Sequence, residues 1–348
     1  MTSQAPESGR SEIALIRDQI KLLDIAQGFF QSQILFALQK MRVFELLDGT
    51  EKTVTDLAAS TSARPDYLRR LLVAGRMLRL LEWRGDDRYA LTPLSQALLA
   101  PSMGENFLGN WVRWLEYLSV PFDRLADTVL NGKPAEALGH LGGDAGDTRE
   151  FTLAMHNYAT LRGRELARVL DTRGYRSLLD LGCGPGTYAF NLGLRNPELT
   201  LHLLDLPPIL EVAKEVRQRY TLTNEVHFLP LDVSAGEIPG RYDLVLVSNI
   251  LQMLGERASR ELIAKVYRCT GPGGSLVIQG QYMPDPETVV PERWPVIVDL
   301  LQLCMTPEGR NHTMAETAEW IESAGFTDVE QRPMSLLNAN SYVQGYKR

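Results

Sequence analysis

The chain has 348 residues, of which 36 are Lys or Arg and 43 are Asp or Glu, so its formal net charge at pH 7 is −7. At roughly 150 residues per domain this length predicts about two domains. A content of 44% hydrophobic and 23% charged residues excludes a disordered or fibrous chain. The acidic balance argues against bulk nucleic-acid binding, which depends on neutralising phosphates.

Cysteine usage and the N-terminal segment indicate the compartment. Three cysteines exclude a disulfide scaffold and fit a reduced protein. The first residues, MTSQAPESGRSE, lack the basic start and apolar run of a signal peptide. No stretch approaches about 18 uncharged apolar residues, so no transmembrane helix is expected. We therefore expect a cytoplasmic protein without a membrane partner.

Residues 13–99 follow a helical pattern, in which apolar residues recur at spacings of three and four. Thr53 is expected to cap a short helix. Ser62 is expected to cap the next helix, over residues 65–81. Together these segments predict a bundle of amphipathic helices at the start of the chain.

Residues 81–91 are typical of a small hairpin that turns at Gly85-Asp86-Asp87. With the preceding helices it makes a winged-helix pattern, so residues 1–100 are predicted to form a helical winged-helix domain. The second helix of this pattern carries several arginines, which raises the question of DNA binding. Acidic residues are interleaved with them and the helix is rich in apolar residues. A scaffold that serves dimerisation is therefore favoured, and no nucleic-acid partner is predicted.

Residues 101–170 remain helical and are predicted to form a lid or connector, interrupted by a glycine-rich loop at residues 138–146. Aromatic side chains gather in this segment at helical spacing. Two interpretations stay open: a packed core, or a wall against a planar substrate. Met155 and Tyr158 are its candidate substrate-binding residues.

From residue 171 to residue 348 short strand-like runs alternate with helical segments. The alternation predicts an α/β domain in which a parallel sheet is covered by helices on both faces. Ligands of such sheets bind beyond the carboxyl ends of the strands. The expected strands are SLLDL, LTLHLLDL, VHFLPLD, YDLVLVSN and GGSLVIQG, with helices near residues 187–195, 209–220 and 257–269.

A glycine-rich loop follows the first of these strands. The strand contains Asp180, and Gly182, Gly184 and Gly186 come directly after it. Glycines at alternate positions let the backbone turn sharply and approach a ligand closely. Taken alone the loop is a weak signal, because dinucleotide-binding folds use G-x-G-x-x-G at the same place.

Polar residues also stand at the ends of the next strands. The second strand ends at Asp205, where a carboxylate can accept hydrogen bonds from both hydroxyls of a ribose. Asp232 and Val233 follow the third strand, at a place suited to contact an adenine. The fourth strand ends in Ser248 and Asn249.

This constellation resembles class I S-adenosylmethionine-dependent methyltransferases, and the layout resembles their small-molecule O-methyltransferases of the caffeate and bacterial natural-product type. The resemblance covers nearly the whole chain and includes FTLAM, LLDLGCGPG, GPGGSLVIQ and TPEGRNHTMAETAEWIESAGF. It implies a winged-helix dimerisation domain, hence a homodimer, before a Rossmann-like domain with a seven-stranded, mostly parallel sheet. It also implies methyl transfer to a small-molecule acceptor with S-adenosyl-L-methionine as cofactor.

The resemblance further implies roles for single residues. Gly182 and Gly184 pass under the methionine part of the cofactor, and Asp205 holds its ribose. Asp232 and Val233 flank the adenine. The other expected cofactor residues, among them the acid that supports the loop, are Asp180, Gly186, Leu206, Ser248 and Asn249. For the aspartates at positions 180 and 232 the alternative is capping of neighbouring helices or loops.

The usual base of this family is absent. A histidine is expected after the fourth strand, where the chain has Gln252, whose amide does not titrate near pH 7. The stretches that carry the family's supporting glutamates read Gln-Gly-Gln at residues 279–281 and Asn311. Three agreeing losses indicate that proton chemistry is different or absent. Either Gln252 orients an acceptor that needs little help, or another base acts, with His156 and His312 as candidates.

Residues 294–305 predict an apolar helix that lines the acceptor pocket, with Trp294, Val298 and Asp299 as candidate substrate-binding residues. An apolar or aromatic acceptor is expected. No H-x-x-H or C-x-x-C spacing occurs, so no metal site is predicted. Two functions stay open: methyl transfer to a small metabolite, and a protein of this fold that binds the cofactor without transferring methyl. The acidic balance disfavours a third, a winged-helix regulator.

Overall fold

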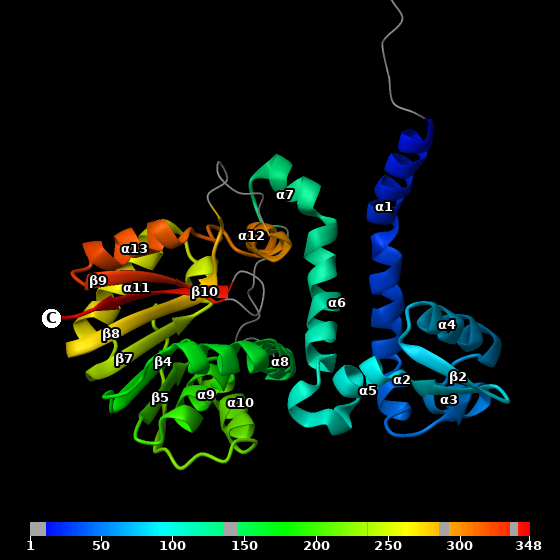
Figure 1. Cartoon of the computed structure of the whole chain (residues 1–348), viewed down its shortest axis with the longest axis horizontal. Coiled ribbons are helices and arrows are strands. Elements are labelled where there is room, and N and C mark those ends of the chain that lie inside the picture. The colour runs from blue at the N-terminus through cyan, green and yellow to red at the C-terminus, as the bar shows by residue number, and fades with distance from the viewer. Residues whose placement is uncertain (1–11, 135–144, 235, 285–291, 335–339) are drawn as a thin grey trace, which may run out of the picture. The chain divides into compact units, whose positions relative to one another are not determined.

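The computed structural model describes residues 12–134, 145–234, 236–284, 292–334 and 340–348. The chain divides into two units, Met1–Gly109 and Asn110–Arg348. Each unit has its own sheet and its own buried core, and each is described by itself (Figure 1).

The first unit combines helices with a small antiparallel sheet of order β1-β3-β2. The predicted hairpin is confirmed as β2 and β3, and the unit is therefore not purely helical. Its elements are α1 (Glu12–Lys40), α2 (Val43–Leu46), β1 (Lys52–Thr53), α3 (Val54–Thr61), α4 (Pro65–Met77), β2 (Leu81–Gly85), β3 (Arg88–Leu91), α5 (Pro93–Leu99) and the 3-10 helix η1 (Pro101–Asn106).

The two predicted helix caps have different outcomes. Thr53 caps α3 as expected, because its side chain accepts the Asp56 amide and the Asp56 carboxylate accepts the Thr53 amide. The prediction for Ser62 is wrong: it ends α3 in the left-handed conformation at φ 55°. The next helix, α4, instead starts at Pro65, which suits a first helical turn. It ends at Met77, before the strand β2 begins.

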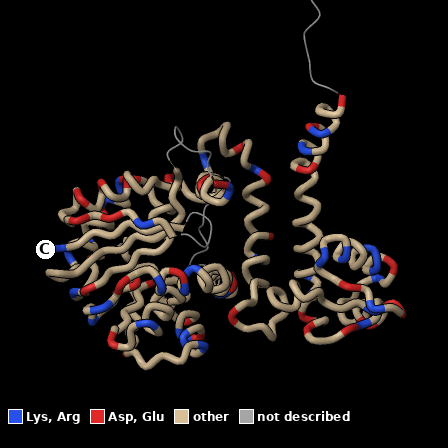
Figure 2. The backbone as a smooth tube through the Cα atoms, viewed as in Figure 1, with Lys and Arg blue, Asp and Glu red and all other residues tan. Residues whose placement is uncertain are grey.

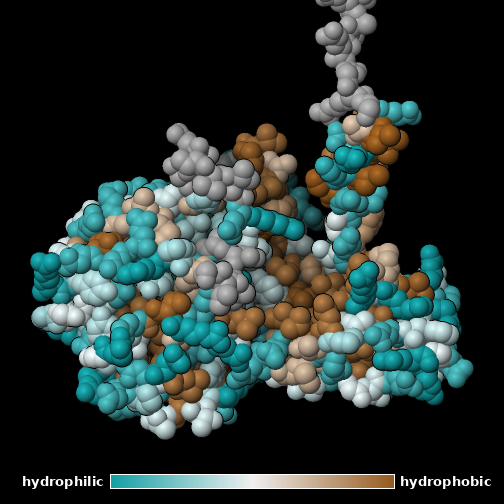
Figure 3. Space-filling view, viewed as in Figure 1, coloured by the Kyte–Doolittle hydropathy of each residue, from teal (hydrophilic) through white to brown (hydrophobic). Residues whose placement is uncertain are grey.

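Helix α1 has one buried end and a long apolar exposed stretch. Leu38 and Phe36 are buried near its C-terminal end. Toward the N-terminus large apolar side chains face solvent, as Figure 3 shows along this helix. The exposed residues are Ile13, Leu15, Ile16, Ile20, Leu22, Leu23, Ile25, Phe29 and Phe30. Contiguous apolar surface of this kind is characteristic of protein interfaces. No helix in the described ranges is long and apolar enough to span a membrane.

The second unit begins with three helices, α6 (Gly109–Asp123), α7 (Leu125–Asn131) and α8 (Ala145–Val169). Most of the predicted glycine-rich loop, residues 138–144, lies outside the described residues. The elements that follow are β4 (Ser177–Leu181), α9 (Thr187–Arg195), β5 (Thr200–Asp205), α10 (Pro207–Arg217), β6 (Val226–Pro230), β7 (Tyr242–Ser248), η2 (Leu251–Met253), α11 (Glu256–Cys269), β8 (Thr270–Gln281), α12 (Arg293–Met305), α13 (Met314–Ser323), β9 (Thr327–Pro333) and β10 (Asn340–Tyr346).

The sheet of the second unit has seven strands in the order β6-β5-β4-β7-β8-β10-β9. Strands β4 to β8 pair in parallel, and β10 runs antiparallel to both β8 and β9. The predicted seven-stranded, mostly parallel sheet is confirmed. The strand order reverses next to β4, so the ends of β4 and β7 meet where open α/β sheets bind ligands.

Helices cover both faces of this sheet (Figure 1). Along β7, Leu244 and Leu246 pack into a core with α8, α9 and α10, whereas Val245 and Val247 pack into a core with α11 and α13. This alternation follows from the two-residue period of a strand. Figure 2 shows that Lys, Arg, Asp and Glu are concentrated on helices and loops, with few along the central strands. The polar side chains at the ends of these apolar strands are therefore candidates for a functional site.

Candidate active site

The glycine-rich loop turns tightly between β4 and α9. Gly182, Gly184 and Gly186 have φ angles of 66°, 53° and 74°, which favour glycine. The Gly182 amide donates to the Leu204 carbonyl on the adjacent strand at 2.9 Å. A Cβ atom at Gly182 would lie 2.5 Å from Ile250, whereas one at Gly184 would meet nothing within 4 Å. A Cβ atom at Gly186 would lie 2.5 Å from Leu203, so the loop is packed against the protein at Gly182 and Gly186 and open at Gly184.

Asp205, at the end of β5, fixes this loop. One carboxylate oxygen accepts the Gly184 amide at 2.8 Å, and the other accepts the Leu206 amide at 2.7 Å. Burial raises the pKa of Asp205, and the two amide hydrogen bonds oppose that shift. Each carboxylate oxygen has a further lone pair. The side chain can therefore hold the loop and still accept hydrogen bonds from a ligand.

Asp180 lies under the loop with 1% of its surface exposed. Neither carboxylate oxygen has a partner at hydrogen-bond geometry. Burial raises the pKa of Asp180 to about 7; the nearby Ala189 amide acts against this shift and the charge of Asp205 adds to it. The Ser248 hydroxyl, at the end of β7, is also buried without a partner. Buried polar groups are normally hydrogen-bonded, so both groups have hydrogen-bonding capacity left for a polar or cationic ligand.

The residues after β6 and β7 are held by their neighbours. One oxygen of Asp232 accepts from the amide and the hydroxyl of Ser234, at 2.9 and 2.6 Å. The Val233 carbonyl accepts from Lys265 at 2.7 Å. Asn249 is left-handed at φ 56°. The carboxylate of Asp232 thus supports its own turn, which was the alternative interpretation of this residue.

A chain of side-chain amides extends from Asn249 across the end of the sheet. The Asn249 amide donates to Gln279 at 3.1 Å, and Gln279 donates to Asn340 at 2.9 Å. Gln281 donates to the same oxygen of Asn340 at 2.7 Å. Sequence reasoning missed Asn340 because it lies on the antiparallel strand β10, whose register with β8 places it opposite Gln281.

Tyr158 of α8 ends this chain of amides. Its hydroxyl accepts from Gln281 at 2.7 Å and from the Trp294 indole at 3.1 Å. The Trp111 ring lies 4.7 Å from the Tyr158 ring, centroid to centroid, and the Arg162 guanidinium lies 3.6 Å from it. The structure therefore brings the candidate residues Tyr158 and Trp294 together in an aromatic cluster. Trp111 is one of the aromatic side chains that the pattern of residues 101–170 predicts to gather here, whereas Arg162 was not predicted.

The remaining candidate substrate residues differ in exposure. Met155 is half-buried on α8, and Val298 is buried on α12. One oxygen of Asp299 accepts the Asn311 amide at 2.8 Å and so ties α12 to the loop before α13.

Gln252, in η2, borders a small cavity. The cavity has a volume of about 20 Å³, which is room for about one water molecule. Its lining includes Asn249, Gln252, Gln281 and His312. The side-chain oxygen of Gln252 is buried without a hydrogen-bond partner. The cavity therefore joins the residue at the family's histidine position to one of the two candidate replacement bases.

His156 is the other candidate base, and it does not line this cavity. It is 1% exposed on α8, and its Nδ1 lies 2.8 Å from the Thr187 hydroxyl at the start of α9. Burial, together with the charge of Arg219, lowers the pKa of His156 to about 4. These contacts give His156 a place in the packing of α8 on α9.

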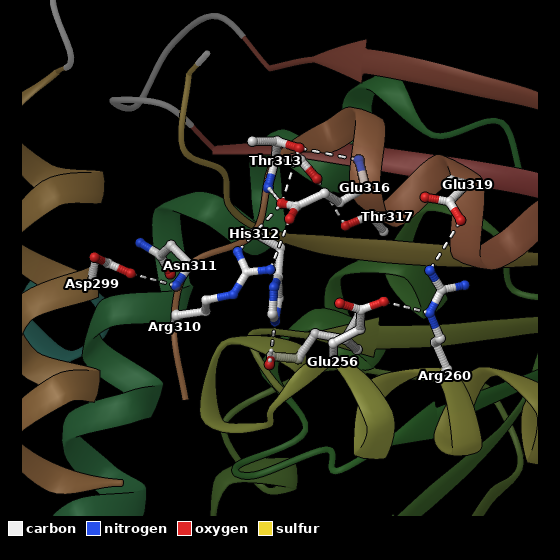
Figure 4. A network of polar contacts seen from close by, with 11 residues as sticks. Glu256, Arg260, Asp299, Arg310, Asn311, His312, Thr313, Glu316, Thr317 and Glu319 are labelled. Atoms are coloured by element: carbon white, nitrogen blue, oxygen red, sulfur yellow. Dashed lines mark hydrogen bonds and ion pairs between the residues drawn. The ribbon is translucent and has the colours of Figure 1, made fainter. Parts of the chain in front are cut away.

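His312 lies on the loop before α13 (Figure 4). Its Nε2 is 3.1 Å from the Leu251 carbonyl oxygen, and its Nδ1 is buried without a partner. Burial and the Arg310 guanidinium lower the pKa of His312. Within the described ranges no group of three or more His, Cys, Asp and Glu side chains is placed to hold a metal ion.

Comparisons with known proteins identify the family and the fold. A model of the O-methyltransferase domain matches residues 122–327, and a model of the O-methyltransferase dimerisation domain matches residues 23–101. The chain is 28% identical over 326 residues to tetracenomycin polyketide synthesis 8-O-methyl transferase TcmO of Streptomyces glaucescens, covering 92% of this chain and 95% of that protein. It is 27% identical to 3-hydroxy-5-methyl-1-naphthoate 3-O-methyltransferase of Streptomyces sahachiroi, covering 94% of each. Human N-acetylserotonin methyltransferase, solved in complex with SAM, shares the fold with a TM-score of 0.84 at 23% identity, covering 98% of this chain and 99% of that one.

Proposed function

The chain belongs to the O-methyltransferase family, and from this premise we propose that it methylates a hydroxyl group of a small apolar or aromatic molecule. S-adenosylmethionine is the methyl donor of the family. The observation that carries the proposal for this chain is the buried carboxyl group of Asp180, next to a loop that is open at Gly184. Its oxygens have no partner at normal hydrogen-bond geometry, and the Ala189 amide lies nearby. A cationic ligand is the complement of such a group.

The donor site is built from the strand ends. The donor supplies a methyl group already activated by a positively charged sulfur. Asp205 keeps lone pairs free for the ribose hydroxyls. Burial raises the pKa of Asp180 to about 7, so a cation bound beside this carboxyl group would favour its ionised form. We assign the remaining contacts with the donor to Gly182, Gly184, Gly186, Leu206, Asp232, Val233, Ser248 and Asn249.

The acceptor site is proposed next to this loop. The rings of Trp111, Tyr158 and Trp294 form an aromatic cluster. Val298 is buried on α12, the helix that also carries Trp294. Aromatic side chains stack on planar ligands. We therefore infer a planar or apolar acceptor. We place Met155 beside this acceptor and Gln252 near its reacting group. Alignment of the two reactants is a large part of what such a site contributes to the rate.

Gln252 makes a second candidate function worth testing. Because its amide cannot take a proton near neutral pH, a protein of this fold that binds the donor without transferring methyl is the alternative. The intact donor site fits both functions. Only the fate of the methyl group separates them.

The test uses a donor with a labelled methyl group and a panel of phenols and quinols. We expect label in the acceptor; tight donor binding with label that never leaves the donor would favour the alternative.

Asp205→Ala is expected to weaken binding of S-adenosylhomocysteine by about 10–100-fold, because hydrogen bonds to a charged group contribute about 1.5–3 kcal/mol. Asp243→Ala is the matched control, since Asp243 also accepts two backbone amides but at the opposite end of the strands. It should leave this binding unchanged.

We further infer that the protein is a homodimer in the cytoplasm. The matched dimerisation domain supports a second copy as partner. The apolar stretch of α1 offers it a surface, with Ile25 at 79% exposure. The three free cysteines are buried, as suits a reducing compartment.

A further inference from the structure

His312 presents a basic nitrogen with a defined hydrogen position. Its Nε2 lies 3.1 Å from the Leu251 carbonyl oxygen. A carbonyl only accepts hydrogen bonds, so Nε2 must carry the hydrogen of the neutral ring. The lone pair is then on Nδ1, which is buried and has no partner. An unsatisfied buried lone pair in a folded protein calls for an explanation.

The same histidine borders the cavity next to Gln252. Both side chains line it, together with Asn249 and Gln281. The oxygens of Gln252 and Gln281 are buried without partners, as is Nδ1 of His312. These groups can accept hydrogen bonds from a hydroxyl group or from one water molecule, and the cavity volume of about 20 Å³ suits either.

The loop that carries His312 is held at several points (Figure 4). Arg310 pairs with Glu316 at 2.7 Å, and Thr313 and Glu316 form a capping box at the start of α13. The Met283 amide donates to the His312 carbonyl at 3.0 Å. These contacts fix the imidazole in place, which is what a reacting group requires of its surroundings.

Several charged groups surround this imidazole. Arg310 lies beside it on the same loop, and Glu316 comes from α13. The peptide carbonyls of Leu251, in η2, and of Leu254, directly after η2, also face it. Burial and Arg310 lower the pKa of His312, and Glu316 and the carbonyls oppose this shift. The imidazole is therefore neutral at pH 7, which is the form that can accept a proton.

We propose that Nδ1 of His312 accepts the hydroxyl proton of the methyl acceptor, directly or through one water molecule in the cavity. This role rests on the proposed function. In the step, a bond forms between the acceptor oxygen and the methyl carbon as the bond between that carbon and the donor sulfur breaks. The electron pair of the broken bond goes to sulfur. The hydroxyl proton goes to Nδ1, and the resulting imidazolium later releases it to solvent. Gln252 orients the hydroxyl by accepting or donating a hydrogen bond.

The matched pair His312→Gln and His156→Gln tests this role. A glutamine at position 312 can still donate to the Leu251 carbonyl, but it has no titratable nitrogen. The probes are phenol and 4-nitrophenol, because the second is far more acidic. We expect kcat for phenol to fall about 10²–10⁴-fold in His312→Gln, the usual contribution of a general base, and kcat for 4-nitrophenol to fall much less. His156→Gln should lower stability and leave the ratio of the two rates unchanged.

The pH dependence gives a second readout. In the wild type, kcat/KM for phenol should fall at acid pH as His312 becomes protonated, and His312→Gln should lose that limb. A double variant that combines His312→Gln with Gln252→His should recover part of the activity on phenol. Equal loss with both phenols, or an unchanged acid limb, would overturn the role.

The hydrogen position can be measured without turnover. In ¹⁵N NMR spectra of the protein with S-adenosylhomocysteine, His312 should show Nε2 protonated and Nδ1 bare at pH 7. The opposite arrangement would also overturn the proposal. If the wild type transfers no methyl to any acceptor, the proposed function fails by itself, and the spectrum still decides which nitrogen of His312 is free.

Discussion

Asp180 should make the free energy of unfolding fall as the pH rises. The unfolded chain titrates this carboxyl near its ordinary pKa of 3.8, whereas burial raises the pKa to about 7 in the folded protein. Between these values the folded state keeps a proton that the unfolded state has released. The pKa shift of about three units therefore lowers the free energy of unfolding by about 4 kcal/mol as the pH rises. This loss is complete above about pH 7.

Asp180→Asn removes this titration and isolates the effect. We expect the variant to gain stability relative to the wild type by about 1–2 kcal/mol near pH 5 and about 4 kcal/mol near pH 8, at about 1.4 kcal/mol per unit of pH. Urea unfolding followed by tryptophan fluorescence measures both. A difference between the two proteins that does not change with pH would refute the reasoning.

Asp171→Asn provides a control of opposite sign. Arg173 holds the pKa of Asp171 at about 2, so this carboxylate stabilises the fold above its unfolded pKa, and that contribution is lost as the pH falls through about 2. S-adenosylmethionine, whose sulfur is positively charged, should raise the unfolding temperature of the wild type more than that of Asp180→Asn, because this charge compensates the buried carboxylate. Equal stabilisation of both would remove Asp180 from the donor site.

Two further predictions concern the interface and the loop before α13. Replacing Phe29 and Phe30 of α1 with Glu should turn a dimer into a monomer in analytical ultracentrifugation, because both rings are more than half exposed in the isolated chain; an unchanged mass would place the interface elsewhere. Thr313→Ala should lower the free energy of unfolding by about 1 kcal/mol through loss of the cap. It should also lower kcat more than it raises KM, because it loosens the loop that holds His312.

The sequence predicts the parallel part of the sheet well for a physical reason. Strands buried on both faces are almost continuous runs of Leu and Val, such as Leu244 to Val247. The alternating glycines that follow β4 indicate a tight turn. The helix over residues 187–195 was predicted with the bounds that α9 has. Strand ends can therefore be placed from the pattern, and with them Asp180 and Asp205.

The contacts of the acceptor side were beyond sequence reasoning. Asn340 meets Gln281 only because β10 is antiparallel to β8, a pairing that no local pattern signals. Arg162 lies on Tyr158 at a helical spacing of four, which is also the spacing of ordinary exposed pairs. Ser62 has the residue type of a cap, but the proline three positions later starts the helix instead.

The relation between Gln252 and His312 shows why a lost base need not mean lost chemistry. The family's histidine and one supporting glutamate are expected at two places, after β7 and before α13. In this chain those places hold Gln252 and Asn311, with His312 as the next residue, and the cavity is lined by both Gln252 and His312. What a general base requires is a free lone pair within reach of the proton, not a fixed position along the chain. Because Nε2 of His312 is committed to the Leu251 carbonyl, only Nδ1 can meet that requirement. In the proposed mechanism the acceptor hydroxyl approaches between the amide of Gln252 and this nitrogen, which would restrict the orientation of any substrate that is methylated.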